Sequence, residues 1–144
     1  MTNVIQAAAD LQRVCESEGW RFCFIGGLAV LRVLLLRAAS GVGLDIALGG
    51  LAFEESAVAR SSLFTFPPDV PLRTCSAEDL IVFKAFADRP KDWVDVDGVI
   101  IRQADTLDWT YVHTQLAPLA ELKDDPRILD RLEARRRELD DRRD

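Results

Sequence analysis

The sequence lacks the marks of secreted and membrane-spanning proteins. Its 144 residues include three cysteines, an odd number without a Cys-x-x-Cys pair, and they stand inside apolar patterns that predict reduced, mostly buried thiols. No apolar run approaches the ~20 residues that a membrane span needs, and the first residues lack a basic segment followed by an apolar one. We therefore expect a cytoplasmic protein that does not enter a membrane.

A surplus of positive charge is also absent. The 24 acidic residues outnumber the 18 lysines and arginines, and the formal net charge is −6. A field of this sign repels a nucleic-acid backbone, so the composition disfavours nonspecific DNA binding. With 49% hydrophobic and 29% charged residues, the chain has the composition and length of one globular domain of roughly 100 to 200 residues. We therefore expect a single domain over residues 1–144.

The first part of the chain, about residues 1–75, predicts one helix and several short strands. Apolar residues recur at spacings of three and four over residues 3–18, which is the helical period, and Gly19 ends the pattern. Residues 20–25 predict a strand that enters a turn at Gly26 and Gly27. Five further short elements follow: a hairpin of 33–38 and 44–48, a helix at 54–60, and strands at 63–66 and 70–74.

The second part, about residues 76–144, predicts helices. The capping-box pattern from Ser76 to Asp79 precedes apolar residues and predicts a helix over 76–87. Pro90 suits the first turn of the next helix, Asp108 an N-cap, and Pro126 the start of the last helix. The expected fold is therefore α+β, with a small, truncated mixed sheet followed by a helical C-terminal half.

Two features of the sheet part suit phosphate and metal chemistry. Gly26 and Gly27 stand between a predicted strand and a helix, where exposed backbone amides can approach a polyphosphate, although two glycines also make a simple tight connection. Asp45 is a lone carboxylate on a predicted strand, and carboxylates suit Mg²⁺. Positions 43 and 47 are Gly and Ala, so no Asp-x-Asp pair forms around it, and metal-assisted phosphoryl transfer needs two or three converging carboxylates.

The helical part offers a cation and two carboxylates. Lys84 lies in a largely apolar helix, and Asp92 and Asp95 are spaced to share one face of the next helix. In one interpretation Lys84 extends to the surface while Asp92 charges the first turn of its helix. In the other interpretation both residues belong to a functional site.

Three segments together resemble the AbiEii-type nucleotidyltransferases, which are toxin-like members of the polymerase-beta-like superfamily. The segments are residues 22–29, residues 44–46, and the pattern of residues 80–95 with Lys84, Arg89, Asp92 and Asp95. The resemblance implies that Gly26 and Gly27 hold a nucleoside triphosphate together with Lys84. It also implies that Asp45 binds Mg²⁺, and that Asp45, Lys84 and Asp92 form the catalytic set.

One departure from the family decides what activity to expect. Family members carry an Asp-x-Asp or Asp-x-Glu pair on the strand soon after the Gly-Gly helix, whereas this chain passes from Arg32 and Val33 directly into the hairpin. Without that pair Mg²⁺ binding is expected to be weak or lost, and nucleotidyl transfer impaired. The least favoured alternative is an active enzyme that takes its carboxylates from Asp92 and Asp95 or from a second subunit.

The missing strand also predicts partners. An open sheet edge is usually covered or paired with another chain, so we expect a homo-oligomer, and the toxin-like resemblance implies an antitoxin partner. The alternative function is a noncatalytic protein-interaction module whose helical half binds a partner protein.

Overall fold

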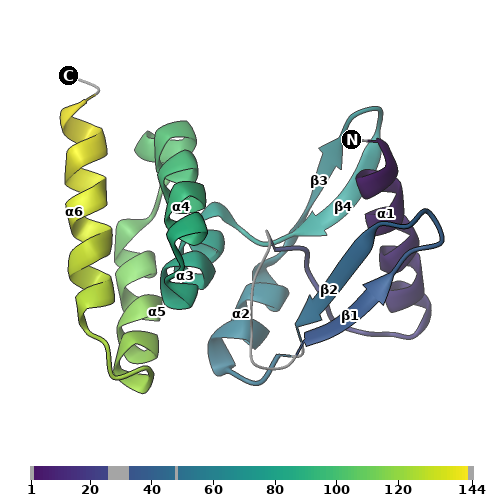
Figure 1. Cartoon of the computed structure of the whole chain (residues 1–144), viewed down its shortest axis with the longest axis horizontal. Helices are drawn as coiled ribbons and strands as arrows, with labels where there is room; N and C mark the ends of the chain where they lie inside the picture. Colours follow the sequence, from purple (N-terminus) through teal and green to yellow (C-terminus); the bar gives the residue numbers. More distant parts are fainter. Residues whose placement is uncertain (1, 26–32, 48, 143–144) are drawn as a thin grey trace. The chain divides into compact units, whose positions relative to one another are not determined.

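The computed structural model describes residues 2–25, 33–47 and 49–142. In these residues the fold is α+β, as the sequence predicts, with small antiparallel sheets in the first part and helices in the second (Figure 1). The elements are α1 (Thr2–Ser17), β1 (Val33–Arg37), β2 (Gly43–Ala47), α2 (Ala52–Arg60), β3 (Ser62–Phe66), β4 (Val70–Thr74), α3 (Ala77–Ala87), α4 (Pro90–Gln103), the 3-10 turn η1 (Ala104–Thr106), α5 (Trp109–Leu122) and α6 (Arg127–Asp141).

The chain divides into two compact units, Met1–Ser76 and Ala77–Asp144. We call them the sheet unit and the helical unit. The single domain expected over residues 1–144 stays a prediction. No helix within the described ranges is both long and apolar enough to cross a membrane.

The sheet unit contains two hairpins. β1 and β2 pair antiparallel from Val33 opposite Ala47 to Arg37 opposite Gly43, which confirms the hairpin predicted around the glycine-rich turn. Gly41 has a φ of 85° in that turn, a conformation that glycine adopts without steric cost. β3 and β4 form the second hairpin, also as predicted, with Ser62 opposite Thr74.

The strand predicted over residues 20–25 is wrong for most of its length. In the structure only Phe24 pairs, as an isolated parallel bridge to Thr74, with its N–H donating to the Arg73 carbonyl at 2.7 Å. Gly19, with a φ of 68°, ends α1, as predicted. Among residues 21–25, only Phe24 finds a strand partner in the described part of the chain, and that partner is β4.

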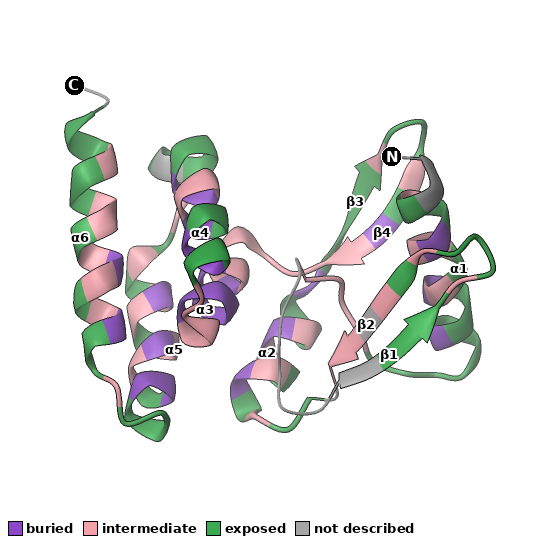
Figure 2. Ribbon diagram, viewed as in Figure 1, coloured by how far each residue is buried: buried purple, intermediate pink, exposed green. Residues whose placement is uncertain are grey.

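The helical unit owes its core to pairs of apolar residues one turn apart. Such pairs lie on the same side of a helix, so each helix turns one stripe inward. The stripes appear as buried positions in Figure 2. The pairs, each residue at most 1% exposed, are Val96 and Ile100 on α4, Val112 and Leu116 on α5, and Ile128 and Leu132 on α6.

The helix boundaries of this unit follow the predicted signals. Pro90 is the first residue of α4, and the Asp108 carboxylate caps α5 by accepting the Tyr111 N–H at 2.9 Å. α3 and α5 are followed by Asp88 and Asp124 in the left-handed region, with φ of 59° and 56°. Aspartate tolerates this conformation better than most residues, so both helices end there.

Candidate functional site

Lys84 stands at the centre of a charged cluster in the helical unit. Its side chain is 2% exposed, because α3 is covered on most sides, with Ile81, Val82 and Ala85 fully buried beside it. The interpretation in which Lys84 extends to the surface is therefore wrong. A buried ammonium loses its hydration, and this cost is tolerated only where oppositely charged groups surround it.

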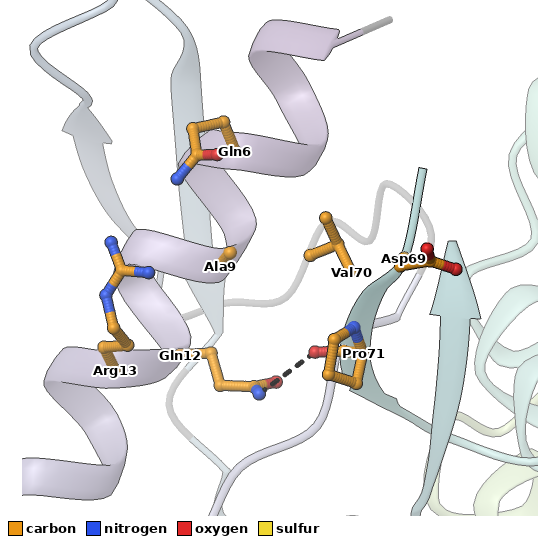
Figure 3. A pocket seen from close by; sticks show the side chains of 7 residues that line it. All are labelled: Gln6, Ala9, Gln12, Arg13, Asp69, Val70 and Pro71. Carbon is orange, nitrogen blue, oxygen red and sulfur yellow. Dashed lines mark hydrogen bonds between the residues drawn. The ribbon is translucent and has the colours of Figure 1, made fainter. Parts of the chain in front are cut away.

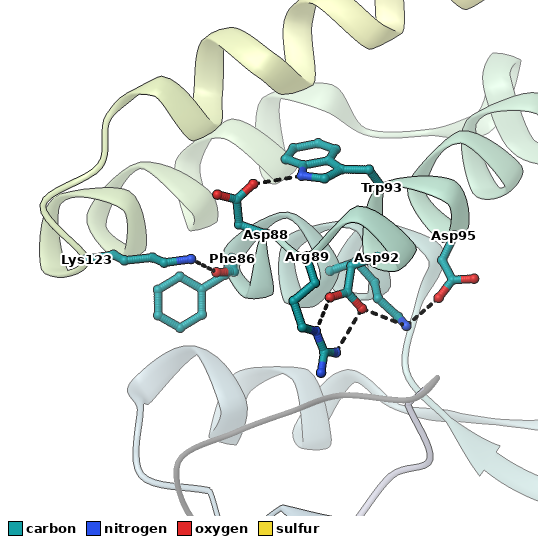
Figure 4. Close-up of polar contacts among 8 residues, drawn as sticks. Phe86, Asp88, Arg89, Asp92, Trp93, Asp95 and Lys123 are labelled. Atoms are coloured by element: carbon teal, nitrogen blue, oxygen red, sulfur yellow. Dashed lines mark hydrogen bonds and ion pairs between the residues drawn. The ribbon is translucent and has the colours of Figure 1, made fainter.

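Two carboxylates of α4 receive the Lys84 ammonium. Its Nζ lies 3.3 Å from Asp92 Oδ1 and 2.5 Å from Asp95 Oδ2 (Figure 4). Asp92 and Asp95 are three positions apart on α4, which places both on the side that faces α3. The two differ in environment, since the Asp92 side chain is 0% exposed and that of Asp95 is 54% exposed.

Arg89 adds a second cation on the opposite side of Asp92. Its guanidinium forms a two-pronged contact, Nε to Oδ2 and Nη2 to Oδ1, the latter at 2.9 Å. Burial by itself would raise the pKa of Asp92, but the hydrogen bonds and charges of Arg89 and Lys84 outweigh it and hold that pKa below its usual value. The hydrogen bond to Asp92 also raises the pKa of Arg89. Asp92 is therefore an ionised carboxylate that bridges two cations.

Contacts from the neighbouring helices hold the α3–α4 loop that carries Arg89. The Asp88 carboxylate accepts from Trp93 Nε1 at 2.7 Å and forms an ion pair with Arg131 of α6. The guanidinium groups of Arg131 and Arg135 lie 5.5 and 5.3 Å from the centre of the Trp93 ring, within the range of cation–π attraction. The loop is thus linked to α4 and α6 on both sides.

The structure brings two of the predicted site residues together. Lys84 and Asp92 are in direct contact, in the helical unit. Asp45 belongs to the sheet unit, where its backbone pairs with Leu35 in the first hairpin. Gly26 and Gly27 lie outside the described residues.

Arg89 and Asp95 join this cluster although the predicted site omitted them. Both belong to the sequence pattern behind the resemblance, so their spacing was the available signal. A lysine at 84 with carboxylates at 92 and 95 needs one helical reversal to meet, and Pro90 marks that reversal.

The carboxylates of the charged cluster are held by cationic side chains. No three His, Cys, Asp or Glu side chains converge within residues 2–25, 33–47 and 49–142. Asp92 and Asp95 already bind cationic side chains, and the buried Asp79 accepts the Tyr111 hydroxyl at 2.7 Å. Magnesium needs several converging oxygen ligands, whereas Asp92 and Asp95 neutralise cationic side chains here. Asp45 as a metal ligand stays a prediction.

A separate hollow of about 280 Å³ lies in the sheet unit, against α1 and the start of β4 (Figure 3). It is lined by Gln6, Ala9, Gln12, Arg13, Asp69, Val70 and Pro71. One of its polar residues is Gln12, whose amide N–H donates to the Pro71 carbonyl at 3.2 Å and whose amide oxygen accepts the Arg73 N–H at 2.9 Å. The Gln12 amide is therefore used to bond backbone groups of β4 rather than to hold a ligand. None of the predicted site residues lines this hollow.

Comparison of the sequence with protein-family models finds no match, and comparisons with curated proteins and with solved structures find none either. The nucleotidyltransferase resemblance therefore stays a hypothesis that depends on the residues quoted for it.

Proposed function

We propose that this chain is a degenerate nucleotidyltransferase-like protein that binds a nucleoside triphosphate weakly and transfers nucleotidyl groups poorly or not at all. The observation that supports the proposal is the buried Lys84 ammonium, held between Asp92 and Asp95. Replacing a buried ion pair by packed apolar residues is often neutral or stabilising, so core stability alone gives little reason for this lysine. The resemblance assigns the same lysine and aspartate to a nucleotide site.

The charge of the cluster argues for weak binding. Lys84 and Arg89 carry two positive charges, and Asp92 and Asp95 carry two negative ones, so these four side chains sum to zero. A triphosphate approaching them gains little net attraction. Of the two carboxylates, Asp95 is the one that is half exposed, so it can rotate toward water and let a phosphate oxygen approach Lys84.

Calorimetric titration with ATP, GTP, CTP and UTP in Mg²⁺ buffer tests the proposal. We expect saturable binding with a dissociation constant of about 0.1 to 1 mM. The Lys84→Met variant should bind at least about tenfold more weakly, because it loses the ammonium. The control is Lys123→Met, which removes a lysine whose Nζ donates to the Phe86 carbonyl at 2.7 Å in the same unit.

Three results would count against the proposal. A folded wild-type protein that gives no heat with any nucleotide at millimolar concentration has no such site. Equal affinity in the wild type and in the Lys84→Met variant places the nucleotide elsewhere. Rapid nucleotidyl transfer that Asp45→Ala abolishes shows an intact enzyme rather than a degenerate one.

A noncatalytic interaction module is the second candidate function. The observation that favours it is a pair of exposed apolar residues on α4, Val94 at 69% and Ile101 at 58%. They lie seven positions apart, two helical turns, and so share one face. Absence of nucleotide binding in the titration above favours this candidate.

A further inference from the structure

β3 is exposed on both faces and along one edge. In the part of the chain that the structure describes, β3 pairs with β4 alone. Leu63 is 58% and Phe64 56% exposed, and neighbouring residues of a strand point to opposite faces. Proteins usually protect such an edge with lysine, proline or a bulge. The strand Ser62–Phe66 has the sequence SLFTF and carries none of these.

Contacts on the far side of β4 show which backbone groups of β3 face outward. The N–H and carbonyl of Arg73 bond to Gln12 and Phe24, and the Pro71 carbonyl bonds to Gln12, so residues 71 and 73 point away from β3. Arg73 lies opposite Leu63 and Pro71 opposite Thr65. In an antiparallel ladder both members of such a pair turn their backbone groups outward. Leu63 and Thr65 therefore present their N–H and carbonyl groups at the outer edge.

We propose that this edge is a self-association surface, where β3 of a second copy of the chain adds in antiparallel orientation. The register centres on Phe64, so that Leu63 of each copy lies opposite Thr65 of the other. Each of these two pairs exchanges two backbone hydrogen bonds, giving four in all. Phe64 then faces Phe64 of the second copy in a non-hydrogen-bonded pair, where side chains approach most closely. The contact is self-complementary, as a two-fold dimer requires.

The charges near the strand favour a second copy as the occupant. No charged residue lies within Ser62–Phe66, so antiparallel self-pairing sets no like charges opposite one another. One added strand pair is a small interface, so we expect a dissociation constant of about 1 to 100 µM.

Sedimentation velocity of the full chain over a range of concentrations tests the inference. The wild type should form a dimer, whereas the Phe64→Lys and Phe64→Glu variants should each stay monomeric, because like charges meet at the centre. An equimolar mixture of the two variants should restore the dimer, since position 64 pairs with itself. Leu122→Lys, a charge at an exposed apolar residue of the helical unit, should leave the dimer intact.

A monomeric wild type at about 100 µM would overturn the inference, as would a dimer that survives both substitutions or a mixture that stays monomeric. Amide hydrogen exchange of the wild type tests the edge contact even if circular dichroism shows that a variant does not fold. Exchange at Leu63 and Thr65 should slow as concentration rises, while the inward-facing Phe64 amide should not change. Exchange independent of concentration at Leu63 and Thr65 refutes the edge contact, and neither experiment depends on nucleotide binding.

Discussion

Replacing Lys84 with methionine removes the cation that joins α3 to α4. Methionine has nearly the length of lysine without its charge, so it fills the same space between the helices. The Asp92 carboxylate, 0% exposed, then keeps its contact with Arg89 but loses the one with Lys84. Asp95 is 54% exposed and can turn to water. The substitution should therefore destabilise the protein mainly because the buried Asp92 carboxylate loses one of its two cationic partners.

The expected loss in unfolding free energy is about 3 kcal/mol. Removing one partner of a buried ion pair costs about 3 to 5 kcal/mol, because the other charge stays buried without compensation. We expect the lower end of this range because Arg89 still neutralises Asp92 and no cavity forms. Total stabilities are about 5 to 15 kcal/mol, so the loss is large enough to measure.

Urea denaturation read by tryptophan fluorescence gives this quantity. The two compact units can unfold separately, so the signal should come from one of them. Trp93 and Trp109 belong to the helical unit, and a Trp20→Phe background removes the third tryptophan. In this background Lys123→Met is the matched control, with an expected loss below about 1 kcal/mol for a surface contact.

A double-mutant cycle with Asp92→Asn separates the ion pair from other effects. If Lys84 and Asp92 stabilise each other, the double variant loses less than the sum of the single losses, by about 1 to 3 kcal/mol. Strictly additive losses refute the reasoning. A loss of unfolding free energy below about 1 kcal/mol for Lys84→Met also refutes it, since a solvent-exposed ion pair contributes no more than that.

Two further substitutions probe Asp92 and the start of α5. The lowered pKa of Asp92 means that its stabilising effect is present above the ordinary aspartate pKa of about 3.9 and fades as the pH falls through the folded-state value. The unfolding free energy lost by Asp92→Asn should therefore shrink below about pH 4, and a pH-independent loss contradicts the assignment. Asp108→Ala should cost about 1 kcal/mol by removing the α5 cap, and an unchanged urea midpoint contradicts that role.

The helices and hairpins could be predicted because their signals are local. Pro90, Asp108 and the one-turn apolar pairs act within a few residues, so their effect on the backbone hardly depends on the rest of the chain. Both hairpins follow from turn residues between apolar runs. The strand at 20–25 failed because strand formation needs a partner, and only Phe24 meets one in the described residues.

For the candidate site, too, the sequence predicted some features and the folded structure decided others. The residue types and spacings of Lys84, Asp92 and Asp95 singled them out in the sequence, but two interpretations of Lys84 stayed open. The tertiary structure excluded the one in which Lys84 reaches the surface, because the packing of α3 against α4 buries the ammonium beside two carboxylates. The contacts of Asp88 with Trp93 and Arg131 likewise appear only after α6 has packed.

Most of the secondary structure and the charge balance could thus be predicted from the sequence, since each depends on residue type and short spacings. Burial, ion pairing and the exposed edge of β3 depend on which segments meet after folding. The contacts concerned join residues that are 8 to 61 positions apart in the sequence, from the Lys84–Asp92 ion pair to the Gln12–Arg73 hydrogen bond. No local pattern encodes such separations, so only the folded chain determines them.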